Sequence, residues 1–206
     1  MKKKVLILGS GGREHAIAWS MSKDKNVEKV YCAPGNGGTL EIAENIIVNL
    51  ANHQEVIRLV QEKEIDLTIV GPENPLARGI VDSFQRVGLR IFGPDAYGAQ
   101  LESSKLFARD LMEEKKVKQP AYYSCNTRDE VESLKDILDL PLVLKADGLA
   151  AGKGVVVCED EKQFQDALNI MFNENSFGDA VNRISLERCL FGEELSVFAV
   201  CDGLDY

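Results

Sequence analysis

A glycine-rich loop with two lysines holds the residue types in this sequence that are best suited to bind a phosphate group. Gly148, Gly152 and Gly154 lie in the loop, Lys145 ends the apolar run before it, and Lys153 lies inside it. Glycines let backbone N–H groups come close to an anion, and the two ammonium groups would bracket its charge. The pattern favours a nucleotide site over its alternative, an ordinary β-hairpin with a solvated loop.

A second glycine turn, at residues 9–12, lies between an expected strand at residues 5–8 and an expected helix at residues 14–21. In this context the N–H groups at a helix N-terminus can hold a phosphate. A dinucleotide site is the competing interpretation, but Glu14 stands where the third glycine of that motif should be. The next strand also leads into residues 33–38, which contain no acidic residue to hold a ribose. Both features count against NAD.

Three other polar residues stand near the expected starts of helices. Glu73 follows a strand at residues 66–70, where a carboxylate could bind sugar hydroxyls or an amine, or simply favour the helix start. Lys105 lies in an early helical turn and, on physical grounds alone, is a solvated residue. His15 fits a surface or capping position, and we assign it no chemistry.

Alternating strands and helices must position these residues. An α/β fold with a parallel sheet is expected up to about residue 92, followed by a second part built around a hairpin. The expected strands are residues 5–8, 27–32, 46–50, 66–70, 89–92, 122–125, 142–144, 155–157, 184–187 and 195–201. The expected helices are residues 14–21, 53–64, 75–86, part of 99–116, 127–138 with a capping box at its start, and 161–172.

Composition excludes several classes of function. The 206-residue chain carries a net charge of −9, whereas a dedicated nucleic-acid-binding protein needs a basic surface. No apolar run is long enough for a signal peptide or a membrane span. Five scattered cysteines without a C-x-x-C pair indicate reduced thiols in the cytosol rather than disulfides or a zinc site.

Six segments resemble the phosphoribosylamine–glycine ligase family of the ATP-grasp superfamily. They are GSGGREHA, PGNGGT, VGPENPLARG, LESSKLF, KADGLAAGKGVVV and LERCLFGEELSV. The resemblance covers the chain and implies a Rossmann-like parallel-sheet amino-terminal domain, an ATP-grasp α+β subdomain and a truncated third domain. It divides the chain into a substrate-binding domain (1–102), a connecting helix (103–122), a small subdomain with the glycine-rich loop (123–188) and the start of a large subdomain (189–206).

The resemblance also implies roles for individual residues, including a catalytic role for Lys145. The expected ATP-binding residues are Lys105, Lys145, Gly148, Gly152, Lys153, Gly154, Glu187, Leu190 and Glu194. The expected substrate-binding residues are Gly11, Gly12, Arg13, Glu14, Asn36 and Glu73. The chain departs from the family's usual residues at Gly37, Arg188, Cys189 and Phe191.

The implied reaction activates glycine with ATP as glycyl phosphate, which the amine of 5-phosphoribosylamine attacks to give glycinamide ribonucleotide in purine biosynthesis. We expect Mg²⁺ or Mn²⁺ ligands only beyond residue 206, so this amino-terminal half is predicted to be inactive alone. We also expect a cytoplasmic monomer or weak dimer that binds small molecules, not nucleic acid or membranes. The alternatives are another carboxylate–amine ligase and a non-catalytic nucleotide- or phosphosugar-binding module.

Overall fold

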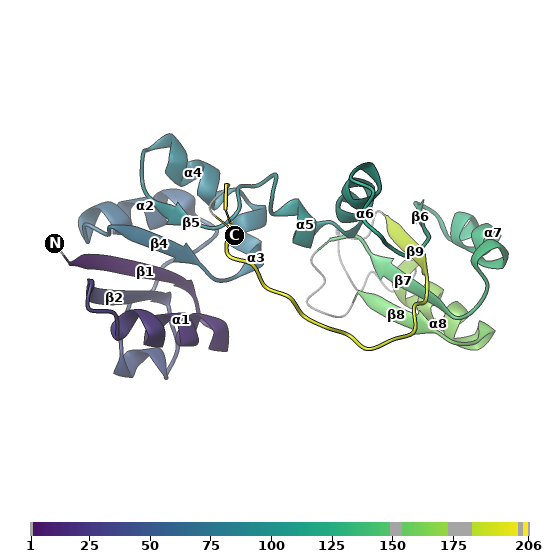
Figure 1. Cartoon of the computed structure of the whole chain (residues 1–206), viewed down its shortest axis with the longest axis horizontal. Coiled ribbons are helices and arrows are strands. Elements are labelled where there is room, and N and C mark those ends of the chain that lie inside the picture. Colours follow the sequence, from purple (N-terminus) through teal and green to yellow (C-terminus); the bar gives the residue numbers. More distant parts are fainter. Residues whose placement is uncertain (1, 149–153, 173–182, 202–203, 206) are drawn as a thin grey trace.

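The computed structural model describes residues 2–148, 154–172, 183–201 and 204–205, which form two β-sheets that follow one another along the chain (Figure 1). The first sheet is parallel and five-stranded, with strand order β3-β2-β1-β4-β5. Its strands are β1 (Lys3–Gly9), β2 (Val27–Pro34), β3 (Glu44–Asn45), β4 (Leu67–Val70) and β5 (Ile91–Phe92). This is the α/β architecture that the alternation of strands and helices predicts.

Four consecutive apolar residues of β1, Val5 to Leu8, point alternately to the two faces of the first sheet, so both faces are buried. Leu6 and Leu8 belong to the core beneath α2 and α4, whereas Val5 and Ile7 pack with Ala18 of α1. The short 3₁₀ helix η1 precedes β3. The elements between the strands are α1 (Gly12–Ser22), η1 (Thr39–Glu41), α2 (His53–Glu62), α3 (Glu73–Ala77) and α4 (Ile80–Arg86).

The strand order reverses between β1 and β4, the centre of this sheet. The chain runs outward from β1 through β2 to β3, and then returns to β4 and β5 on the other side of β1. In open α/β sheets, ligands bind beyond the carboxyl ends of the strands at such a switch point. The loops after β1 and β4 are therefore placed to form a site.

Two expectations for the first sheet are wrong in detail. Residues 46–50 do not form a strand: pairing stops after Asn45, and Ile46, Val48 and Leu50 pack against the core beside α2. The helix expected at residues 75–86 is broken into α3 and α4 at Gly79, whose positive φ of 77° is outside the helical range.

Two short helices connect the sheets: α5 (Gln100–Ser103) and α6 (Lys105–Glu114). They are separated at Ser104, whose extended backbone lets its hydroxyl accept a hydrogen bond from Phe107 N as the N-cap of α6. The helical spacing seen in the sequence therefore corresponds to two helices, and the cap places Lys105 in the first turn of the second.

The second sheet is antiparallel and four-stranded, with strand order β6-β9-β7-β8. The capping box predicted at Thr127 and Glu130 is confirmed at the start of α7. Helices α7 and α8 bury their apolar faces on one side of this sheet. The elements are β6 (Tyr122–Cys125), α7 (Arg128–Leu138), β7 (Leu142–Ala146), β8 (Val155–Cys158), α8 (Glu161–Phe172) and β9 (Ile184–Arg188).

After β9 the chain leaves the second sheet and runs back toward α3 (Figure 1). The strand expected at residues 195–201 is not formed, because no strand in the described part of the chain pairs with it. Leu195, Val197 and Phe198 in this segment are about nine-tenths exposed. No helix among the described residues is both long and apolar enough to cross a lipid bilayer.

Candidate functional site

A cavity of about 590 Å³ lies at the switch point of the first sheet. This volume is within the range of small-molecule sites. The loops after β1 and β4 line it, together with the segment that precedes α2. The lining residues are Gly9, Ser10, Gly11, Glu14, Pro34, Val48, Asn49, Leu50, Ala51, Pro72, Asn74, Pro75 and Arg78.

Glu14 is the buried carboxylate of this cavity. Only 4% of the residue is exposed, and its Oε2 accepts a hydrogen bond of 2.6 Å from Gly11 N. The N–H group of Gly11, which the sequence offered to a phosphate, is therefore used within the protein. Glu14 instead presents a fixed negative charge, which suits hydroxyl or ammonium donors of a ligand.

Arg13 links the two expected substrate-binding carboxylates, Glu14 and Glu73. Its Nε lies 3.2 Å from Oε1 of Glu14, and its Nη2 lies 3.5 Å from Oε2 of Glu73. Arg13 is largely exposed and Glu73 about half exposed, and neither is among the residues that line the cavity. Gly12 begins α1 and likewise does not line the cavity. The structure thus gathers these residues at one edge of the sheet.

Asn36 braces the two glycine turns against each other. Its Nδ2 donates to the carbonyl oxygens of Ser10 at 2.9 Å and Gly11 at 3.3 Å. Its Oδ1 accepts from the N–H groups of Gly38 at 2.8 Å and Thr39 at 3.0 Å. The structure therefore shows Asn36 fixing the shape of the turn after β1, a role that the sequence did not suggest.

Three polar residues that line the cavity were missed by the sequence analysis: Asn49, Asn74 and Arg78. Among the described lining residues, Arg78 is the basic one. Asn74 and Arg78 are four residues apart around α3, so the helix after Glu73 contained a signal for them. Asn49 was hidden because residues 46–50 were interpreted as a strand.

A second cluster of polar residues lies on the second sheet. Alternate residues of a strand point to opposite faces, and Leu144 and Leu186 lie in the core beneath α7 and α8. Lys145, Ser185 and Glu187 therefore share the opposite face, with Lys145 and Ser185 paired in register across β7 and β9.

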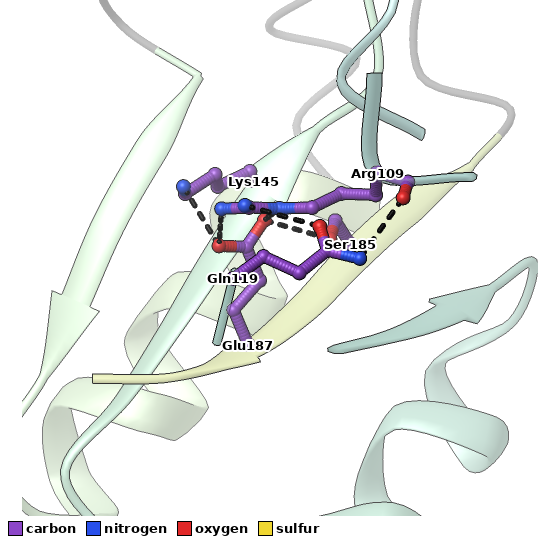
Figure 2. Close-up of polar contacts among 5 residues, drawn as sticks. All are labelled: Arg109, Gln119, Lys145, Ser185 and Glu187. Carbon is purple, nitrogen blue, oxygen red and sulfur yellow. Dashed lines mark hydrogen bonds and ion pairs between the residues drawn. The ribbon is translucent and has the colours of Figure 1, made fainter. Parts of the chain in front are cut away.

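Glu187 is the centre of this cluster, and Lys145 and Arg109 converge on it (Figure 2). Lys145 Nζ lies 2.8 Å from Oε2 of Glu187, and Arg109 of α6 binds the same carboxylate through two nitrogen atoms. Ser185 Oγ donates to Oε1 at 2.9 Å. The side chain of Glu187 is only 2% exposed, so the cluster is a buried charge network.

Two opposing effects act on the Glu187 carboxyl. Burial alone would raise its pKa, but hydrogen bonds and charges from Arg109 and Lys145 outweigh burial and hold the pKa below its ordinary value. Glu187 is therefore ionised at neutral pH. With two cations and one carboxylate, the group carries a net positive charge that favours a nearby anion.

Lys105 and Asp147 fasten α6 to the start of the glycine-rich loop. Lys105 Nζ donates to the carbonyl oxygen of Gly148 at 2.9 Å. Asp147 accepts hydrogen bonds from Ser104 Oγ at 3.0 Å and from Arg183 Nη2 at 2.9 Å. Asp147, Arg183 and Arg109 were not singled out from the sequence, because their partners come from other elements.

The remaining expected ATP-binding residues are Gly152, Lys153, Gly154, Leu190 and Glu194. Gly154 lies beside the end of β7, where its carbonyl oxygen accepts from Ala146 N at 2.7 Å. Leu190, 67% exposed, and Glu194 lie in the segment after β9, away from regular structure. Gly152 and Lys153 lie outside the described residues.

No group of three or more histidine, cysteine, aspartate or glutamate side chains gathers among the described residues in a way that could hold a metal ion. Glu187 on β9 is engaged by Arg109 and Lys145, and Asp147 after β7 is engaged by Arg183. They do not fit a Mg²⁺ or Mn²⁺ site, so no step below depends on a metal ligand from this part of the chain.

Two solved structures illustrate the fold that this chain shares with known proteins. The chain aligns with a phosphoribosylamine–glycine ligase from Thermotoga maritima with a TM-score of 0.75 and 27% identity, over 92% of this chain and 44% of that one. It aligns with N5-carboxyaminoimidazole synthetase from Staphylococcus aureus, complexed with ADP, with a TM-score of 0.72 and 18% identity, over 92% and 48%. The second likeness concerns the fold alone. The class is that of the ATP-grasp proteins, because residues 103–206 match a family model described as an ATP-grasp (A) domain.

Sequence comparison identifies the family. Residues 3–102 match the N domain of phosphoribosylglycinamide synthetase, and residues 103–206 match its ATP-grasp (A) domain. The chain therefore belongs to the phosphoribosylglycinamide synthetase family, in which the curated relatives carry the name phosphoribosylamine–glycine ligase.

Two curated relatives illustrate the match. The phosphoribosylamine–glycine ligase of Clostridium acetobutylicum is 46% identical over 97% of this chain and 48% of its own length. The enzyme of Escherichia coli K12 is 44% identical over 97% of this chain and 47% of its own length. The chain thus spans about half the length of the curated relatives it matches.

Proposed function

We propose that the protein ligates glycine to 5-phosphoribosylamine at the expense of ATP, giving glycinamide ribonucleotide, ADP and phosphate. A glycine carboxylate oxygen bonds to the γ-phosphorus as the bond from that phosphorus to the ADP oxygen breaks. The amine nitrogen of phosphoribosylamine then bonds to the carbonyl carbon, phosphate leaves, and the amine loses a proton. Mg²⁺ or Mn²⁺ would accompany ATP as part of the nucleotide substrate.

The cavity of the first sheet is the proposed site for phosphoribosylamine. Glu14 offers a fixed carboxylate to the amine or sugar hydroxyls, and Arg78 offers a cation to the phosphate. Asn49 and Asn74 supply further polar groups to the lining. Four further residues contact the substrate or hold the turns that contact it: Gly12, Arg13, Asn36 and Glu73.

The proposed ATP site is the open face of the second sheet, which is the face opposite α7 and α8. Lys145 would neutralise phosphate charge that develops as ADP leaves, and Lys105 would contact the phosphates from the start of α6. Val155 and Val157 lie on the same face, 45% and 50% exposed; Val155 is paired with Lys145 and Val157 with Val143 in the register of β7 and β8. Such an apolar strip suits the flat face of a purine.

We also propose the division of the chain into residues 1–102, 103–122, 123–188 and 189–206, a cytoplasmic location, and a monomer or weak dimer. The change of family domain after residue 102 and the separate sheets support the first boundary. Family membership supports the remaining proposed nucleotide contacts, which are Gly148, Gly152, Lys153, Gly154, Leu190 and Glu194.

One observation carries the proposal: Lys105 and Lys145, from different elements, both lie at the start of the glycine-rich loop, and Lys145 belongs to a cluster with net positive charge. The test measures ADP formation by the complete protein with ATP–Mg²⁺, glycine and phosphoribosylamine, omitting each in turn. We expect turnover only when all are present, and a fall of at least about 100-fold for Lys145→Met, as for other electrostatic catalytic groups. ADP release that is unchanged without glycine or phosphoribosylamine would reject the proposal.

A further inference from the structure

Arg109 is held in one position at both ends of its length. Its backbone oxygen accepts from Gln119 Nε2 at 3.0 Å, and its Nη1 lies 3.5 Å from Gln119 Oε1. Its Nε donates to Oε1 of Glu187 at 3.0 Å, while Nη2 donates to Oε2 (Figure 2). A planar guanidinium bound to a carboxylate through two nitrogens has a fixed geometry. Arg109 is therefore the permanent partner of Glu187.

Lys145 is the weaker partner of the same carboxylate. It makes one ion pair with Glu187, at 2.8 Å, and its side chain is 23% exposed, compared with 14% for Arg109. A lysine ammonium lies on a flexible stem and accepts a new partner with little geometric constraint. Of the two cations, Lys145 is the one that can move toward a ligand.

Removing one partner from a buried ion pair leaves an uncompensated buried charge, which is strongly unfavourable. If Lys145 were the sole partner of Glu187, moving its ammonium to a phosphate would carry that penalty. With Arg109 in place, Glu187 keeps two hydrogen bonds from the guanidinium and one from Ser185. The carboxylate then remains neutralised when Lys145 leaves.

We propose that Arg109 is a positioning residue that retains Glu187 so that Lys145 can exchange the carboxylate for a nucleotide phosphate. This inference rests on the proposed ATP site and adds a role for a residue that does not itself contact the nucleotide. Arg109 acts on affinity for phosphate groups, through Lys145, and not on affinity for the nucleoside.

The test compares ADP–Mg²⁺ and adenosine binding to the complete protein by calorimetry, in the wild type, Arg109→Met, Glu187→Gln and the double variant. Arg128→Met is the matched control, since Arg128 is ion-paired with Glu132 on α7. In Arg109→Met we expect ADP affinity to fall about tenfold or more, because Lys145 stays with Glu187 and a charge-assisted phosphate contact is lost. Adenosine affinity should be unchanged.

The double variant separates positioning from simple structural support. Once Glu187 is neutral, Lys145 has no carboxylate to retain, so Arg109→Met/Glu187→Gln should bind ADP about tenfold more tightly than Arg109→Met. Equal losses of ADP and adenosine affinity in Arg109→Met, or no recovery in the double variant, would overturn the role of Arg109. If the wild type binds neither ligand, the proposed ATP site fails, and this inference fails with it.

Discussion

The carboxylate of Glu14 fills the space that a side chain at Gly71 would need. A Cβ atom built on Gly71 would lie 2.1 Å from Oε1 and 2.4 Å from Cγ of Glu14. The glycine after β4 and the glutamate of α1 therefore fit together across the central strands of the first sheet. This contact fixes where the negative charge of the cavity lies.

Gly71→Ala should displace Glu14 into the cavity. We expect a loss of about 1–3 kcal/mol in the free energy of unfolding from overpacking, measured by urea denaturation, together with loss of phosphoribosylamine binding. Gly37→Ala is the control, because a Cβ there would meet nothing within 4 Å. Equal effects of the two substitutions would contradict the fit between Glu14 and Gly71.

The caps of α6 and α7 give a matched pair of variants. Ser104 and Thr127 each accept a hydrogen bond from a backbone N–H group in the first turn, but only Ser104 also binds Asp147. Ser104→Ala and Thr127→Ala should each cost about 1 kcal/mol of stability. Only Ser104→Ala should weaken ATP binding, because it loosens the loop next to Lys105. An equal change in affinity for both variants would show that Ser104 acts through stability alone.

The buried carboxyl of Glu187 should make stability depend on pH in the acid range. Its pKa is lower in the folded state than its ordinary value of 4.5, because Arg109 and Lys145 outweigh the opposing effect of burial. The ionised Glu187 carboxylate therefore contributes to the stability of the folded state above pH 4.5. This contribution is lost as the pH falls through the pKa of Glu187 in the folded state.

In Glu187→Gln, the free energy of unfolding should decrease less between pH 7 and pH 3 than it does in the wild type. Glu161→Gln is the comparison: the pKa of Glu161 is also lowered, mainly by Lys135, but its side chain is 53% exposed. Glu161→Gln should change the acid-dependent loss of stability by less, because solvent screens the pair of Glu161 with Lys135. If the loss of stability between pH 7 and pH 3 is the same in Glu187→Gln as in the wild type, a charged and paired Glu187 is contradicted.

Thiol reactivity should divide the five cysteines into two groups. Burial raises the pKa of Cys32, Cys125 and Cys158 to about 11, so these side chains are neither ionised nor accessible at pH 8. Cys189 and Cys201 are partly or fully exposed. Mass spectrometry after brief iodoacetamide treatment of this chain should find the label on these two. Rapid labelling of any buried thiol in the native chain would show that its core opens readily.

Local patterns predicted local structure well. The capping box at Thr127 and the apolar strands around the glycine-rich loop are present because each depends on residues close together in sequence. The same kind of reasoning failed at residues 46–50, where an apolar run packs on the core without strand pairing. Periodicity reports which side chains are buried, not which backbone groups are paired.

The chemistry of the site was only partly readable from the sequence. The pattern around the glycine-rich loop singled out Lys145, and the family resemblance singled out Glu187. Their contact depends on β7 pairing with β9, a register that a single sequence does not specify. Arg109 joins them from a third element, α6. Asn36 was expected at the substrate, and its hydrogen bonds between two turns become visible only when both turns are placed.

The most direct measurement is a calorimetric titration of this 206-residue chain with ATP–Mg²⁺, beside Lys145→Ala and with NAD as a control ligand. The proposed ATP site predicts saturable binding of ATP–Mg²⁺, weakened at least about tenfold in Lys145→Ala by the loss of a charge-assisted contact. NAD should give no comparable heat. Binding of NAD in preference to ATP, or ATP binding that is unaffected by loss of the Lys145 ammonium, would contradict a nucleotide site on the open face of the second sheet.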